Sequence, residues 1–115
     1  MSWNLHVGKV YQIEYEYPGM FGSNAQDALY NIFSMFDIET TAEDCYDEDY
    51  EVEREELRRL RTIITEEGEE FRKQAEEFEK ALSLAELTKD RFIQILNNLI
   101  NDSDQKNSCV LLSWF

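Results

Sequence analysis

Residues 3–17 read WNLHVGKVYQIEYEY, and their alternation of apolar and polar side chains indicates the fold class. In an extended segment, one face carries Trp3, Leu5, Val7, Tyr11, Ile13, Tyr15 and Tyr17. The opposite, polar face includes His6 and the glutamates. Period-two alternation that is rich in aromatic and β-branched residues predicts a half-buried strand. Because Gly8-Lys9 interrupts the pattern, the segment forms either one kinked strand or a small hairpin that turns there.

A second strand is predicted at residues 109–115, which read CVLLSWF. This run is apolar on both faces, as in a strand that is covered on two sides. Between the two strands, apolar residues recur every three or four positions and predict helices over 24–36, 53–82 and 83–101. Helix caps are indicated at Ser23 with Gln26, and at either Ser83 with Glu86 or Thr88 alone. Gly68 lies within the long middle helix and is expected to bend it or to break it in two.

These elements predict an α+β fold in a single globular domain over residues 1–115. It has an N-terminal strand or hairpin, three to four helices, and a C-terminal strand that pairs with the N-terminal one. Two strands alone make a marginal sheet, so we expect the hairpin to supply a third strand or a partner chain to complete the layer. No periodicity is visible over residues 37–49. The spacing of Tyr46, Tyr50 and Val52 also allows a short acidic strand, but a loop is favoured.

The net charge is −14, from 25 acidic and 11 basic residues, and most of it lies in residues 37–56, here called the acidic segment. The acidic segment holds eleven acids and a single base, Arg54, a net charge of −10. Affinity for phosphate backbones comes mainly from Lys and Arg, so this charge argues against direct binding to nucleic acid. The same reasoning argues against binding to anionic membranes. A basic protein surface is the natural partner for such a segment.

The sequence also bears on location and chemistry. No apolar run approaches the ~20 residues of a membrane span, and residues 1–6 lack the pattern of a secretory signal, so we expect a cytoplasmic protein without membrane contact. His6 is the sole imidazole, and Cys45 and Cys109 show no disulfide framework or metal-ligand spacing. The common nucleophile, phosphate-loop and zinc motifs are absent. We therefore predict no catalytic, cofactor-binding or metal-binding residues, and no enzymatic activity.

We expect a small acidic binding protein of the inhibitor, immunity or adaptor type, which engages a basic partner protein through the acidic segment. The expected contacts are carboxylates with two tyrosine anchors: Asp44, Tyr46, Asp47, Glu48, Asp49, Tyr50, Glu51 and Glu53. One alternative is a nucleic-acid mimic that blocks a DNA- or RNA-binding enzyme. Another is a metal-dependent hydrolase that uses helical E-x-x-E pairs, at Glu53/Glu56, Glu66/Glu69, Glu67/Glu70 and Glu76/Glu79. The terminal strands also allow a homo-oligomer.

Overall fold

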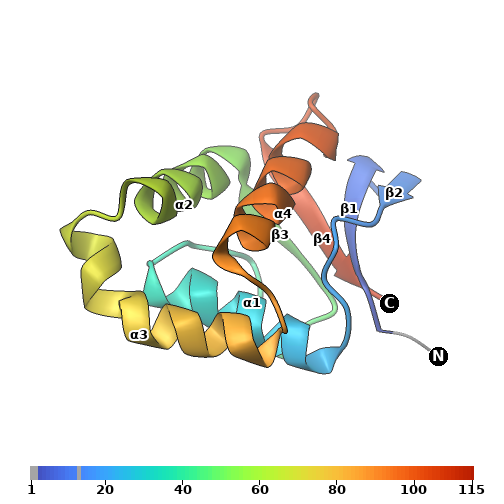
Figure 1. Cartoon of the computed structure of the whole chain (residues 1–115). Helices are drawn as coiled ribbons and strands as arrows, with labels where there is room; N and C mark the ends of the chain where they lie inside the picture. Colours follow the sequence, from blue (N-terminus) through green and yellow to red (C-terminus); the bar gives the residue numbers. More distant parts are fainter. Residues whose placement is uncertain (1–2, 13) are drawn as a thin grey trace.

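The computed structural model describes residues 3–12 and 14–115 (Figure 1). Their elements follow in the order β1 (Leu5–Val10), β2 (Glu14–Glu16), α1 (Ser23–Met35), β3 (Asp49–Glu53), α2 (Arg54–Glu66), α3 (Glu69–Leu84), α4 (Lys89–Asp102) and β4 (Cys109–Trp114). The predicted α+β class is confirmed. Among the helices described, none has the length and apolarity needed to cross a membrane.

The strands form one antiparallel sheet in the order β2-β1-β4-β3. At its centre β1 pairs with β4, with Leu5 opposite Trp114 and Val7 opposite Leu112, so the predicted pairing of the N-terminal and C-terminal strands is confirmed. β2 joins the other side of β1 as the second arm of a hairpin. β3, which the sequence did not favour as a strand, pairs with β4 along its whole length, from Asp49 to Glu53.

The hairpin turns after Val10 and not at Gly8-Lys9. Gly8 is required for another reason: a Cβ atom there would lie 2.1 Å from the carbonyl oxygen of Tyr11, which folds back over the strand with a φ of 41°. The pairing register shifts between Gly8 and Val10. Ile13, which the alternation placed on the buried face, lies outside the described residues.

The turn and the register shift place the hairpin tyrosines on the face opposite to the predicted one. Tyr15 and Tyr17 pack against the ring of His6, which alternates along β1 with the core residues Leu5 and Val7. The single apolar stripe predicted over residues 3–17 is therefore wrong beyond β1. An extra, unpaired residue in a strand moves the side chains that follow it to the opposite face of the sheet.

The helices follow the predicted pattern, with one correction at a helix end. α1 is capped by the backbone of Gly22 without a side-chain hydrogen bond, so the predicted Ser23 cap is wrong. α2 and α3 are separate because Glu67 adopts a left-handed conformation directly before Gly68, as one of the two expected outcomes at that glycine. The Thr88 side chain caps α4 by accepting a hydrogen bond from the Arg91 amide, which is the second of the two caps predicted for this helix.

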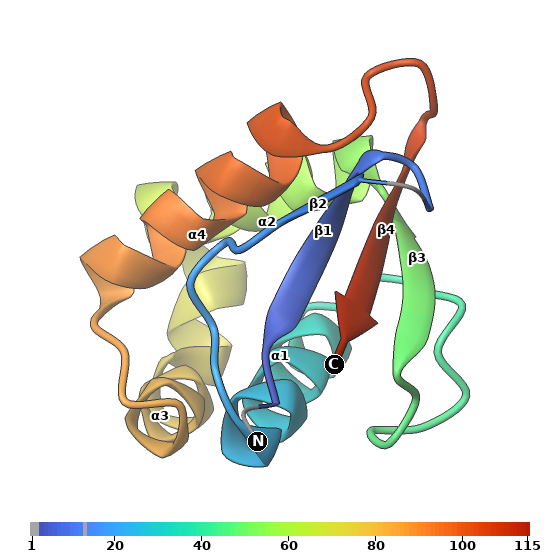
Figure 2. The same ribbon diagram turned by 90° about the vertical axis from the view of Figure 1, so that its right-hand side faces the viewer.

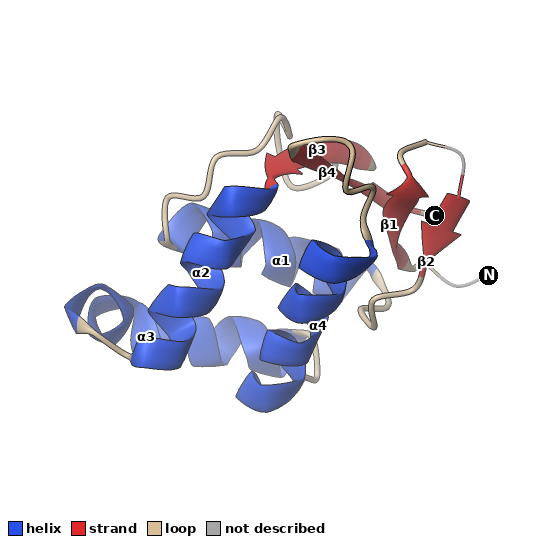
Figure 3. Cartoon of the chain, turned by 90° about the horizontal axis from the view of Figure 1, so that it is seen from above, coloured by secondary structure: helices blue, strands red, loops and turns tan. Residues whose placement is uncertain are grey.

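The helices lie on one side of the sheet, where α1 packs on α3 and α2 packs on α4 (Figure 3). Between them, the rings of Phe36, Phe71, Phe78 and Phe92 pack in series within the core. We call the opposite side of the sheet the outer face; Figure 2 shows the strands from this side, in front of α1 and α2. β4 is buried on both faces as predicted, but side chains and not a second layer of helices cover Leu111 and Ser113 on the outer face.

Candidate protein-binding surface

The acidic segment comprises a loop over residues 37–48, the strand β3 and the first turn of α2. The loop returns alongside β3, where Thr40 pairs with Val52 as an isolated bridge. The Thr41 amide donates to the Glu51 carbonyl at 3.0 Å, and the Glu51 amide donates to Thr41 Oγ1 at 2.8 Å. These bonds cover part of the outer edge of β3, which would otherwise present unpaired backbone groups.

Carboxylates shape the turn at residues 43–47. Asp44 Oδ1 accepts a hydrogen bond from the Tyr46 amide at 2.8 Å, and Asp47 Oδ2 accepts one from the Glu43 amide at 2.5 Å. Aspartates that bind nearby backbone amides in this way favour tight turns. Tyr46 is thereby held with its side chain 78% exposed.

The same turn is attached to the rest of the fold by its carbonyl groups. Gln26 of α1 donates from Nε2 to the Asp47 carbonyl at 2.9 Å, and the Trp114 amide of β4 donates to the Glu48 carbonyl at 2.7 Å. The acidic turn is therefore held in a fixed position by the helical layer and by the sheet, without any partner.

The side chains of β3 alternate between the core and the outer face, and all of its carboxylates point outward. Tyr50 and Val52 point into the core, and Asp49, Glu51 and Glu53 point to the outer face. Tyr50 is only 4% exposed, and burial raises its pKa to about 12. Its side chain cannot reach a partner on the surface, so its prediction as an anchor is wrong. Tyr50 is buried because it occupies an inward position in the alternation of β3. The sequence favoured a loop here and so did not predict this burial.

The other predicted contacts remain accessible. Asp44, Tyr46, Glu48, Asp49 and Glu53 are exposed, and Asp47 and Glu51 are partly buried. Asp49, Glu51 and Glu53 share the outer face of one strand, and the remaining residues lie on the turn that leads into it. The structure therefore brings the predicted carboxylates together along one edge of the sheet.

Two of the eleven acids in the acidic segment have cationic partners: Glu55 pairs with Arg58, and Glu56 pairs with Arg59. Within the described part of the chain, the other nine form no ion pair within 4.0 Å: Asp37, Glu39, Glu43, Asp44, Asp47, Glu48, Asp49, Glu51 and Glu53. Elsewhere, glutamates of α3 pair with Lys73 and Lys80. Acids without an ion pair also occur in other parts of the described chain, but nine of the seventeen lie within this segment of 20 residues.

Arg54, the single base of the acidic segment, does not neutralise it. Its side chain is 7% exposed and donates to the Asn107 carbonyl at 2.6 Å, the Asp104 carbonyl at 2.8 Å and Ser103 Oγ at 3.1 Å. These acceptors are uncharged groups in the turn between α4 and β4. Arg54 therefore joins the start of α2 to that turn and leaves the carboxylates of β3 without a cation.

A shallow pocket of about 180 Å³ lies beside β3, lined by Glu39, Thr40, Thr41, Glu51, Glu53 and Cys109. The Cys109 thiol lies 3.5 Å from Glu53 Oε1, and partial burial and this carboxylate raise its pKa. A thiol that stays protonated at neutral pH is a poor nucleophile. The sequence did not predict that Tyr11 contacts Glu51. Hydrogen bonding to the Glu51 carboxylate raises the pKa of Tyr11 to about 12.

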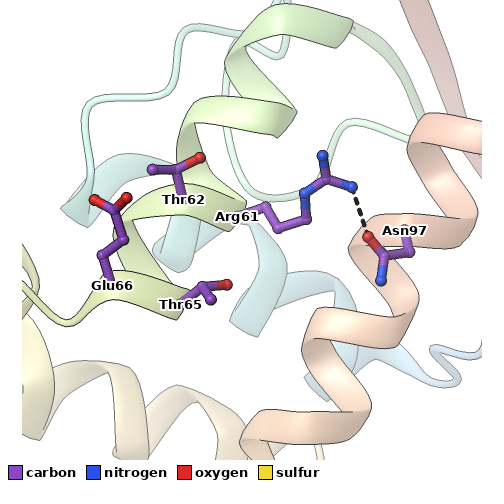
Figure 4. Close-up of a pocket in the computed structure, with 5 residues that line it drawn as sticks. All are labelled: Arg61, Thr62, Thr65, Glu66 and Asn97. Atoms are coloured by element: carbon purple, nitrogen blue, oxygen red, sulfur yellow. Dashed lines mark hydrogen bonds between the residues drawn. The ribbon is translucent and has the colours of Figure 1, made fainter.

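A second pocket, of about 300 Å³, lies between α2 and α4 (Figure 4). It is lined by Arg61, Thr62, Thr65, Glu66 and Asn97, and Arg61 Nη1 donates to Asn97 Oδ1 at 2.6 Å. This bond ties the two helices together. Among the residues that the structure describes, no three His, Cys, Asp or Glu side chains are grouped closely enough to hold a metal ion.

His6, which the sequence placed on the polar face of its strand, is buried. Its side chain is 4% exposed because the rings of Phe115 and Tyr17 cover it on the outer face, at centroid distances of 3.6 and 4.5 Å.

Comparisons of the chain with protein-family models, with curated proteins and with solved structures found no match.

Proposed function

We propose that the protein acts by binding a basic partner protein through the acidic segment, as an inhibitor, immunity protein or adaptor, without catalysis. The observation that carries the proposal is a group of seven carboxylates without ion pairs, on a turn and a strand that are held in place by the fold: Glu43, Asp44, Asp47, Glu48, Asp49, Glu51 and Glu53. Tyr46, which is 78% exposed within this group, provides an aromatic contact. A cytoplasmic location is proposed from the sequence features alone.

Electrostatics favour this function over mere solubility. Like charges on one edge of a sheet repel each other, and neighbouring lysines or arginines would lower that cost, as they do on α3. A cationic partner supplies the missing countercharge. It would also be drawn to this edge over a distance of about 10 Å at 0.1 M salt, which accelerates association.

The test compares two variants with the same net charge. The patch variant carries Glu48→Gln, Asp49→Asn and Glu53→Gln, and the control variant carries Glu66→Gln, Glu79→Gln and Asp102→Asn. All six residues are exposed, and among the described ion pairs none includes them. Each exposed ion pair contributes ~0.2–1 kcal/mol, so losing three weakens binding on the order of tenfold.

Wild-type protein and both variants serve as baits for cell extracts at low and high salt, and retained proteins are quantified by mass spectrometry. We expect basic proteins that the wild type and the control variant retain, and that the patch variant and high salt release. Equal retention by the patch and control variants would show that net charge alone, and not this surface, determines binding.

The mimicry alternative is less well supported by the geometry. β3 presents one row of three outward carboxylates, Asp49, Glu51 and Glu53, whereas a duplex presents two continuous rows of phosphates. An excess of duplex DNA in the same extracts tests it. A mimic would lose its partner to the DNA, and the proposed binding protein would lose it only where that partner also binds DNA.

A further inference from the structure

The outer face carries an aromatic cluster, formed by His6, Tyr15, Tyr17 and Phe115. The His6 and Phe115 rings stack at 3.6 Å with an interplanar angle of 11°, and Tyr15 meets Phe115 edge-on at 5.3 Å. The His6 Nδ1 atom lies 3.2 Å from the Asn4 carbonyl, which fixes the ring at the bottom of the cluster. Tyr17 and Phe115 remain 61% and 52% exposed, so the cluster presents aromatic surface to solvent.

The same face carries the carboxylates of β3. The pairing register places His6, Ser113 and Asp49 in one row across three strands. At ~4.8 Å between neighbouring strands, His6 and Asp49 are about 10 Å apart, on either side of β4. Tyr11, which belongs to the hairpin, lies near Glu51, since this carboxylate raises the pKa of Tyr11. Aromatic rings and carboxylates therefore border a single strip of sheet along β4.

We propose that this strip binds an arginine-rich segment of the partner, lying along β4. Its guanidinium groups stack on Tyr17 and Phe115 on one side and pair with Asp49 and Glu51 on the other. This inference rests on the proposed function and specifies the chemistry of the partner. Both halves of the strip attract cations: a carboxylate by its charge, and an aromatic ring by the negative potential of its face.

Arginine fits the strip better than lysine does. A guanidinium is planar, stacks on aromatic rings and binds a carboxylate through two parallel hydrogen bonds, whereas an ammonium is a compact and strongly hydrated charge. Because side chains cover Leu111 and Ser113, the segment lies over these side chains, with β1 and β3 each about 5 Å to the side of β4 and within reach of an arginine side chain. Exposed rings on a sheet can also stack nucleic-acid bases, but the unpaired carboxylates beside them would repel the phosphates.

The test uses two short synthetic peptides, in which either arginine or lysine alternates with serine. Binding is measured by fluorescence anisotropy at low salt. We expect the wild type to bind the arginine peptide about fivefold more tightly than the lysine peptide. Tyr17→Leu and Phe115→Leu should each weaken the binding of the arginine peptide more than that of the lysine peptide, and so reduce this preference. Phe21→Leu is the matched control, because Phe21 is as exposed as Tyr17, at 61%, and does not belong to the cluster.

A second measurement does not depend on the folding of any variant. His6 is the sole histidine, so its ring protons give an isolated NMR signal from beneath Tyr17 and Phe115. We expect the arginine peptide to shift this signal in the wild type and the lysine peptide to leave it in place.

Equal affinity for the two peptides, or an unmoved His6 signal, would overturn the inference. If the patch variant then bound both peptides more weakly than the wild type and to the same extent, the proposed function would stand without the inference. If the patch variant bound both peptides like the wild type, the proposed function itself would fail. Displacement of the arginine peptide by a single-stranded oligonucleotide would also overturn the inference, in favour of a base-stacking surface.

Discussion

Replacing Arg54 by methionine tests whether this buried arginine holds the acidic strand in place. The substitution keeps an apolar side chain of similar length and removes three hydrogen bonds, to the Asn107 carbonyl, the Asp104 carbonyl and Ser103 Oγ. Hydrogen bonds that involve a charged group contribute ~1.5 kcal/mol or more each, which gives about 4.5 kcal/mol. Asn107 is exposed, so water replaces part of this loss, and we expect unfolding to become easier by about 3 kcal/mol.

The assay is urea denaturation followed by tryptophan fluorescence and circular dichroism. With a slope of ~2 kcal/mol per M, the midpoint should fall by about 1.5 M. Arg58→Met is the control, because Arg58 forms a solvent-exposed pair with Glu55 and should cost less than about 0.5 kcal/mol. Arg54→Lys should not restore stability, since one ammonium cannot reach all three acceptors. If Arg54→Met lowered the midpoint no more than Arg58→Met, our account of the buried arginine would be refuted.

Three further predictions concern single residues. Gly8→Ala should destabilise the hairpin by about 2 kcal/mol, because the added Cβ meets the Tyr11 carbonyl at 2.1 Å, and thermal melting should show it. Tyr11 and Tyr50 have pKa values raised to about 12, so the stability they contribute is present below pH ~10 and lost as pH rises towards 12. Melting temperatures across this range should therefore fall less in Tyr11→Phe and Tyr50→Phe variants than in the wild type; an equal fall would contradict the assignment. The Cys109 thiol, with its raised pKa, should react with a disulfide reagent more slowly in the folded protein than in urea, as measured in a Cys45→Ser variant.

The sequence predicted the elements whose periodicity is strong. The helices at residues 23–35 and 89–102 and the pairing of β1 with β4 follow from apolar patterns that match what the core requires. The break between α2 and α3 was one of two expected outcomes at Gly68, and the structure adds the left-handed turn at Glu67 that produces it.

Strand β3 was the less favoured of two interpretations, because acidic residues are uncommon in strands. Its sequence, Asp-Tyr-Glu-Val-Glu, nevertheless alternates between polar and apolar residues, and this alternation places Tyr50 inside and the carboxylates outside. The outer face was missed for a different reason. Residue periodicity cannot show where a hairpin adds an unpaired residue, and that addition moves Tyr15 and Tyr17 onto the side of His6.

The central place of β4 in the sheet affects how the protein forms during translation. β4 is the last of these strands to leave the ribosome, and it separates β1 from β3 in the sheet (Figure 2). The roughly 50 residues between β3 and β4 take about 3–10 s to synthesise at ~5–20 residues per second. Throughout that interval the nascent chain carries two strands with open edges, which are sites for chaperone binding or aggregation. Substitutions in β4 should therefore lower the yield of folded protein in cells more than the refolding of the purified chain.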